Sequence, residues 1–157
     1  MSNAVKILVG SMSGTAEMAA DEVETTLREA GISANVVGLD EIKLSEIQPG
    51  AYVICTSTYG VGEVPDNAKA LYEALQTERP DLGGVVYGVV GLGDSIYPET
   101  FCFGGKRFDK LLGELGAVRL GERVDHDSRS ALRPEEVAAE WADGWAKLLI
   151  ELLDRGG

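Results

Sequence analysis

The order of apolar and polar residues along the chain predicts strands that alternate with helices. Short apolar runs rich in β-branched residues predict buried strands over residues 5–10, 34–38, 51–57, 85–91 and 118–124. Apolar residues at helical spacing predict helices over residues 15–30, 67–76 and 105–115, and another from Pro134 onward. Strands that alternate with helices form a parallel sheet covered on both faces. The pattern therefore predicts an α/β fold in one domain, residues 1–157.

Two of the predicted helices carry clear apolar stripes. In the first, Ala19, Val23 and Leu27 recur every four residues and are expected to face the core. In the last helix the expected buried stripe consists of Val137, Trp141, Trp145, Leu148, Leu149 and Leu152.

The charge of the chain limits its partners. The sequence has 14 Lys and Arg against 26 Asp and Glu, which gives a net charge of −12. So few basic residues do not suit the phosphates of nucleic acid or an anionic membrane, and we expect neither as a partner. The acidic surface would suit a basic protein partner. Solubility alone explains the same charge equally well.

The cysteines and the N-terminus predict a reduced, cytoplasmic protein. Two cysteines, Cys55 and Cys102, are too few for a disulfide framework. Cys55 lies within an apolar run and is expected to be buried. The first residues lack the pattern of a signal peptide, and every apolar run is shorter than a membrane-spanning helix.

The loop after the first strand is suited to bind a phosphate group. Ser11, Ser13 and Thr15 supply hydroxyls, and the loop ends at a helix N-terminus, which attracts anions. The loop contains no Lys or Arg, so it is not the Lys-containing loop that binds nucleoside triphosphates. A single phosphate monoester fits better. The alternative is an ordinary helix cap with small turn residues.

The loops after the third and fourth strands are suited to hold a planar ring. Tyr59 stands beside Gly60 and Gly62 in one loop, and Tyr97 lies in the other. In a parallel sheet these loops meet the first one at the carboxyl edge, where such folds bind ligands. Two aromatic side chains could enclose a flat ligand there. The alternatives are a surface turn around Tyr59 and a turn-capping role for Asp94.

The three loop sequences resemble those of a known family. The motifs GSMSGTAE, STYGVGEVPDN and GLGDSIYPETFC are similar to the FMN loops of flavodoxins and of the FMN domains of diflavin reductases. The resemblance covers nearly the whole chain and implies the strand order 2-1-3-4-5. The sequence around residues 125–127, together with Trp141 and Trp145, looks most like the MioC group of small flavodoxin-like proteins, and the chain resembles the short-chain type.

The resemblance also implies the residues that contact FMN. The phosphate group would be held by Ser11, Met12, Ser13, Gly14, Thr15 and Ala16. The flavin ring would lie against Ser57, Thr58, Tyr59, Gly60, Val61 and Gly62 on the second loop. The third loop would contribute Leu92, Gly93, Asp94, Tyr97, Phe101 and Cys102. No residue is expected to act as a catalytic group or as a metal ligand. We expect the single histidine, His126, in a loop, with a surface or hydrogen-bonding role.

These features predict a one-electron carrier rather than an independent enzyme. The expected partners are a flavin reductase as donor and an acceptor enzyme, and the carrier itself is expected to be a monomer. Two alternatives remain at this point. One is an FMN-dependent NAD(P)H:quinone-type reductase, and the other is a regulatory module that has kept the fold without the flavin.

Overall fold

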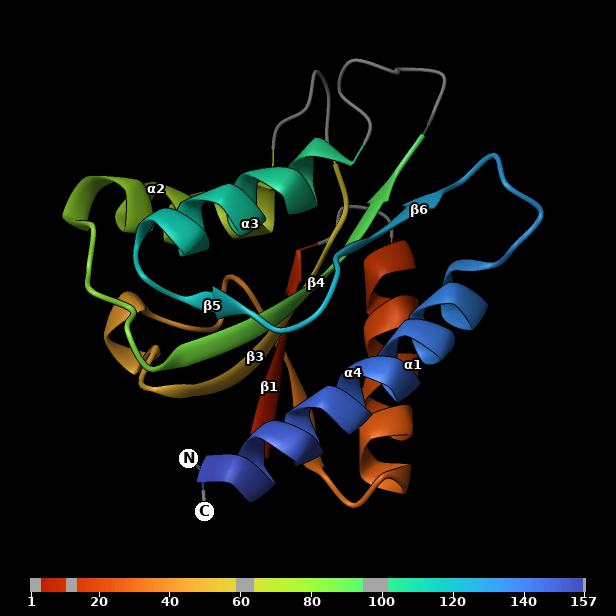
Figure 1. The fold of residues 1–157 in the computed structure, drawn as a ribbon. Coiled ribbons are helices and arrows are strands. Elements are labelled where there is room, and N and C mark those ends of the chain that lie inside the picture. The colour runs from red at the N-terminus through yellow and green to blue at the C-terminus, as the bar shows by residue number, and fades with distance from the viewer. Residues whose placement is uncertain (1–3, 11–13, 59–63, 95–101, 157) are drawn as a thin grey trace.

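The computed structural model describes residues 4–10, 14–58, 64–94 and 102–156. Figure 1 shows how the elements are arranged. The strands are β1 (Ala4–Gly10), β2 (Ser33–Gly38), β3 (Gly50–Thr56), β4 (Val85–Gly93), β5 (Val118–Arg119) and β6 (Val124–Asp127). The helices are α1 (Thr15–Glu29), α2 (Asp66–Glu78), α3 (Phe103–Glu114), α4 (Pro134–Gly156) and the short 3-10 helix η1 (Leu44–Glu46).

The strands form one parallel sheet in the order β2-β1-β3-β4-β5, which confirms the expected order. The fifth strand is different from the prediction. Instead of a continuous strand over residues 118–124, two short strands, β5 and β6, pair with successive parts of β4. The interruption has a local cause. Gly121 has a φ of 76°, and Nε of Arg119 donates a hydrogen bond to the carbonyl of Gly121 at 3.0 Å.

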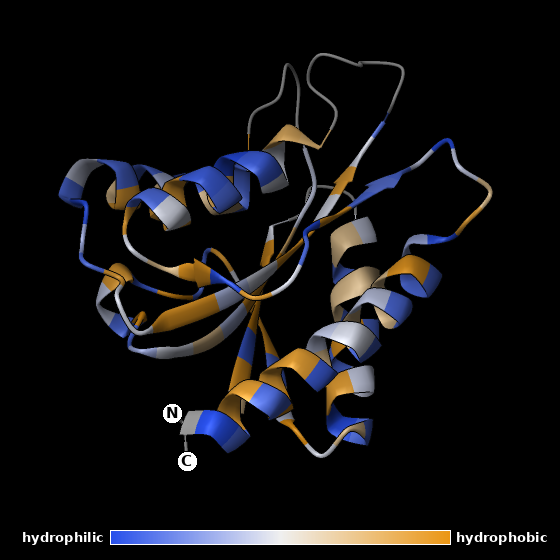
Figure 2. Cartoon of the chain, viewed as in Figure 1, coloured by the Kyte–Doolittle hydropathy of each residue, from blue (hydrophilic) through white to orange (hydrophobic). Residues whose placement is uncertain are grey.

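Helices cover both faces of the sheet. Helices α1 and α4 pack on one face, and α2 and α3 pack on the other (Figure 1). Side chains alternate along β4 accordingly: Val86 and Val90 face α1 and α4, while Tyr87 and Val89 face α2 and α3. Apolar residues lie along the strands and on the helix sides that face them (Figure 2). The predicted apolar face of α1 is confirmed, since its three named residues are all fully buried.

The buried side of α4 is only partly the predicted one. Trp145 and Leu149 are buried as expected, but Leu148 is 39% exposed and its predicted burial is wrong. Small residues make up much of the buried side instead, namely Ala138, Ala142 and Ala146. Because small side chains let two helices approach closely, α4 can lie against α1 on the same face of the sheet. Among the residues that the structure describes, no helix has the length and apolar content needed to cross a membrane.

Two tryptophans of α4 pack against a glycine in the middle of β4. The rings of Trp141 and Trp145 are stacked, with centroids 5.7 Å apart and an interplanar angle of 21°. A Cβ atom on Gly88 would lie 2.6 Å from atoms of both rings, which is closer than atoms can approach. Gly88 therefore provides the space in which the two rings contact the sheet.

Candidate functional site

Residues at or near the carboxyl ends of three neighbouring strands lie in one row across the sheet. Gly10 of β1 is in register with Thr56 of β3, which is in register with Gly91 of β4. The amide of Ser57 donates to the carbonyl of Gly10 at 2.9 Å, and Asn67 Nδ2 donates to the carbonyl of Val9 at 3.2 Å. The hydrogen bonds join the bases of the first and second loops, and the register places the base of the third loop beside them.

The first loop leads into α1 through Gly14. This residue has left-handed backbone angles, φ 85° and ψ −10°, and precedes the first turn of the helix. Glycine suits this position because other residues adopt such angles only at a cost. Ala16 is buried, and its carbonyl accepts a hydrogen bond from the Cys55 thiol at 3.3 Å, so the helix start is fixed against β3. Of the predicted phosphate-binding residues, Ser11, Met12 and Ser13 lie outside the described part of the chain.

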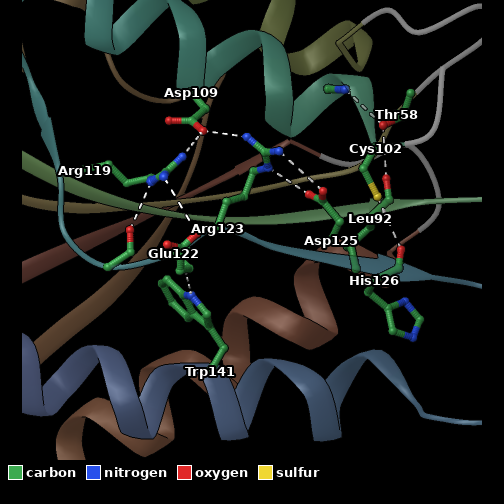
Figure 3. A network of polar contacts seen from close by, with 12 residues as sticks. Thr58, Leu92, Cys102, Asp109, Arg119, Glu122, Arg123, Asp125, His126 and Trp141 are labelled. Atoms are coloured by element: carbon green, nitrogen blue, oxygen red, sulfur yellow. Dashed lines mark hydrogen bonds and ion pairs between the residues drawn. The ribbon is translucent and has the colours of Figure 1, made fainter. Parts of the chain in front are cut away.

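Thr58 connects the second loop to the third. Its hydroxyl donates to the carbonyl of Leu92 at 3.1 Å and accepts a hydrogen bond from the amide of Gly104 at 3.0 Å (Figure 3). The start of α3 approaches closely here, since a Cβ on Gly104 would lie 2.2 Å from the carbonyl oxygen of Ser57. The Thr58 side chain therefore holds the two loops together. The predicted contacts Tyr59, Gly60, Val61 and Gly62 lie outside the described residues.

Cys102 forms the far end of the third loop. It is the N-cap of α3 and has left-handed backbone angles, φ 55° and ψ 27°, which are unusual for a residue other than glycine. A Cβ on Gly93 would lie 2.7 Å from the amide nitrogen of Cys102, so the two ends of the loop are in contact. The Cys102 thiol donates to the carbonyl of His126 at 3.5 Å (Figure 3). Tyr97 and Phe101 lie between these ends and outside the described residues.

Both thiols near the site stay protonated at neutral pH. Burial raises the pKa of Cys55 to about 12. Burial also raises the pKa of Cys102 to about 12, and the nearby Asp125 carboxylate adds to the shift. The expected burial of Cys55 is confirmed, since its exposed fraction is 0%. Neutral, buried thiols are poor nucleophiles, so they act here as small packing groups.

The turn after β6 supplies residues that sequence reasoning did not select. Nε of Arg129 lies 2.6 Å from Oδ1 of Asp94, and the amide of Ser128 donates to the carbonyl of Gly93 at 2.8 Å. Both contacts reach the segment where β4 enters the third loop. The sequence of this turn has no recognisable motif. The only signal in the sequence is the position of Arg129 shortly after the predicted fifth strand, close to the same sheet edge.

His126 differs from its predicted position. It is 5% exposed and lies on β6 rather than in a loop, so the loop and surface expectation is wrong. The expected hydrogen-bonding role is confirmed: Nε2 is 2.8 Å from the carbonyl oxygen of Leu132. The polar sequence of β6 hid this strand, because its side chains do not alternate between apolar and polar.

An ion-pair network around the buried carboxylate of Asp109 fixes β5 and β6 beside α3. Oδ2 of Asp109, on α3, accepts hydrogen bonds at 2.6 Å from both Arg119 and Arg123 (Figure 3). Its Oδ1 accepts another from the Tyr87 hydroxyl at 2.7 Å. Arg123 also pairs with Asp125 at 2.9 Å. Burial, with a further contribution from the Asp109 carboxylate, raises the pKa of Tyr87 well above its usual range. The network therefore positions the strand that flanks the third loop.

Comparison with known proteins identifies the family. The family model described as Flavodoxin matches residues 7–141. Protein MioC of Escherichia coli K12 is 36% identical, and the match covers 92% of this chain and 97% of MioC. The NADPH sulfite reductase flavoprotein alpha-component of Bacillus subtilis is 39% identical over 96% of this chain, which corresponds to 24% of that longer protein.

A solved structure has the same fold. A cysteine-to-alanine mutant of a flavodoxin from Pseudomonas aeruginosa superposes with a TM-score of 0.83 and 38% sequence identity. The superposition covers 93% of this chain and 98% of the other. The order of the parallel strands, the family match and these relatives agree, and the chain belongs to the flavodoxin family.

Proposed function

We propose that this chain binds one FMN at the carboxyl edge of its sheet and carries single electrons between protein partners. The observation that supports this most directly is the row formed by Gly10, Thr56 and Gly91 at the carboxyl edge of the sheet. The first two loops whose sequences resemble FMN loops follow Gly10 and Thr56 directly, and the third leaves β4 two residues after Gly91. A ligand held by one loop would therefore also be within reach of the others.

The phosphate end would be held at the start of α1. The amides of a first helical turn have no partner within their own helix, and the positive end of the helix dipole favours an anion there. Gly14 and Thr15 lie at this position, next to residues 11–13. Neutral donors of this kind suit a monoester, so we assign the phosphate to residues 11–16.

The ring end would lie between the second and third loops. We assign the two ring faces to Tyr59 and Tyr97, and the polar edge of the ring to the amides around Gly93 and Cys102. The contact between Gly93 and Cys102 supports this, because it directs both ends of the third loop to one place. Thr58 would act indirectly, since its hydroxyl is already used to hold Leu92 and Gly104. The bound flavin supplies the redox chemistry, and the protein tunes it.

The partners are proposed from the relatives. This chain matches part of a protein whose name includes both NADPH and flavoprotein, which suggests that a flavin reductase is the donor. An acceptor enzyme would complete the transfer. We also propose that the carrier is a monomer, because an electron carrier must expose its site and separate readily from each partner.

The test is a titration of the purified protein with FMN, followed by stepwise anaerobic reduction under an absorbance beam. We expect saturable binding of one FMN and two separate one-electron steps. Failure to bind FMN would overturn the assignment of all three loops. Reduction in a single two-electron step by NADPH alone would show a reductase enzyme rather than a carrier.

A further inference from the structure

The segment from Phe103 to Arg123, which contains α3 and β5, is basic in an otherwise acidic chain. Between Phe103 and Arg123 there are five of the 14 basic residues and three of the 26 acidic ones, so this segment has a net charge of +2. The remainder of the chain has a net charge of −14. This local excess of positive charge distinguishes the segment from the rest of the chain. Arg119 and Arg123 share the Asp109 carboxylate, and Lys106, Arg107 and Lys110 lie on α3.

Three of these basic residues line a hollow between α2 and α3, which we call the α3 hollow. It has a volume of about 640 Å³, and four cationic side chains line it: Arg79, Lys106, Arg107 and Lys110. Among the residues that the structure describes, one carboxylate lines the hollow, Glu114, which lies 3.8 Å from Arg79. The described lining therefore contains more cationic than anionic side chains.

The same hollow contains apolar surface. Tyr72, Phe103 and Leu111 line it together with the cations. The ammonium of Lys106 lies 5.5 Å from the centre of the Phe103 ring, which holds a charge at the edge of the apolar surface. An apolar floor with a charged rim is the arrangement typical of a protein interface.

The α3 hollow lies next to the proposed redox site. Phe103 follows Cys102 directly, and the amide of Gly104 donates to Thr58 in the second loop. A protein bound over the first turns of α3 would therefore contact the rim of the site. An electron-transfer partner has to bind next to the redox site, and a protein bound at the α3 hollow would meet this requirement.

We propose that the α3 hollow is a docking surface for an acidic protein partner, one that presents an apolar side chain surrounded by Asp and Glu residues. This inference rests on the proposed function for its redox role, but the binding itself does not require FMN. Under this proposal two partners of opposite charge would bind at different surfaces. A basic partner would bind the acidic remainder of the surface, and an acidic partner would bind the α3 hollow.

The overall charge and the local charge act over different distances. At about 0.01 M ionic strength the Debye length is about 30 Å, so an acidic partner is repelled by the whole chain. At about 0.15 M the Debye length is about 8 Å, and an acidic partner interacts only with the charges near it, those of the α3 hollow. We expect affinity for an acidic protein to rise between these two salt concentrations and to fall again near 1 M, where local attraction is screened as well.

The test uses cytochrome b5 as an acidic probe and cytochrome c as a basic one. Binding to the full chain, with and without FMN, is measured by NMR chemical-shift titration across that salt range. The double variant Arg107→Glu/Lys110→Glu reverses the charge of two rim residues. We expect it to weaken binding of the acidic probe about tenfold at 0.15 M, since two favourable charge contacts become repulsive.

The matched control is Lys147→Glu/Arg155→Glu on α4, which changes the net charge by the same amount on the opposite face of the sheet. We expect it to change the binding of the acidic probe less than twofold. Equal weakening by both double variants, or no binding of the acidic probe to the unaltered chain, would overturn the proposal. The docking proposal is tested by binding of the acidic probe without FMN, whereas the proposed function is tested by titration with FMN. Failure of one can therefore be distinguished from failure of the other.

Discussion

Arg129 and Asp94 form an ion pair that joins the turn after β6 to the end of β4. The guanidinium Nε and the carboxylate Oδ1 are 2.6 Å apart, although the residues are 35 positions apart in the chain. The side chains are 53% and 37% exposed. The pair fixes the point at which the chain enters the third loop, so its effect should be seen in ligand binding more than in folding.

The variant Arg129→Ala should weaken FMN binding about two- to fivefold, because an exposed ion pair contributes up to about 1 kcal/mol. Asp94→Asn should have a similar effect, and the double variant should lose less than the sum of the two. Fluorescence titration with FMN measures all three dissociation constants. Arg133→Ala, which removes another exposed ion pair close by, is the control and should leave FMN affinity unchanged. Fully additive losses would show that the two side chains act independently.

The variant Asp109→Asn should lower the free energy of unfolding by about 2–4 kcal/mol, because it leaves two arginines without the buried carboxylate that they share. Urea unfolding measures this loss. Asp143→Asn removes an exposed carboxylate that pairs with Lys147, and it should change stability by less than about 0.5 kcal/mol. Similar losses in the two variants would mean that burial of the network contributes nothing.

The variant Gly88→Ala should destabilise the fold by about 1–3 kcal/mol, because the new methyl group would force both tryptophan rings to move. Gly144→Ala is the matched control, on the helix that carries the two tryptophans. A Cβ there has no atom within 4 Å, and alanine is the better helix former, so stability should rise by up to about 1 kcal/mol. The urea concentrations at the unfolding midpoints of the two variants measure these changes in stability. A Gly88→Ala protein as stable as the unaltered chain would contradict the packing described for β4.

The buried thiol of Cys55 should make stability fall at alkaline pH. Its pKa is about 12 in the folded chain against an ordinary value of 9.0. Its contribution is therefore complete below pH 9 and is lost as the pH rises towards 12, because only the unfolded thiol ionises in that range. The slope should be about 1.4 kcal/mol per pH unit.

Cys55→Ala should remove that slope, and urea unfolding at about pH 7.5 and about pH 10.5, on either side of the ordinary thiol pKa, measures it. Other groups that titrate in this range, Tyr87 among them, are present in both proteins and cancel in the comparison. If the two stability curves are parallel between these pH values, burial of Cys55 does not determine the loss.

Most of the fold could be predicted from the sequence, because β1, β3 and β4 consist mostly of apolar residues and α1 has a regular apolar stripe. The fifth strand could not. It is interrupted at Gly121, and its second half, β6, is mostly polar. The sequence of β6 therefore shows neither a continuous apolar run nor an alternation of apolar and polar residues. The exposure of Leu148 was also hidden, since close packing of alanines against α1 determines which side of α4 is buried.

The site was predictable where its residues lie in the loop motifs. The meeting of the three loops at one edge of the sheet follows from the expected strand order, whereas the register of Gly10, Thr56 and Gly91 comes from the structure. The supporting contacts were not predictable. Arg129 and Asp109 act through partners far away in the sequence, and a charged side chain on a surface pattern usually indicates only a solvated position.

The stacked tryptophans on Gly88 also give the protein an optical reporter of its own. They are the only two tryptophans in the sequence, so all of its indole fluorescence comes from one place, the contact between α4 and β4. Two indoles at this separation and angle also couple electronically and should add a paired signal to the circular dichroism spectrum. Detachment of α4 from the sheet can therefore be followed without a label, separately from events at the loops.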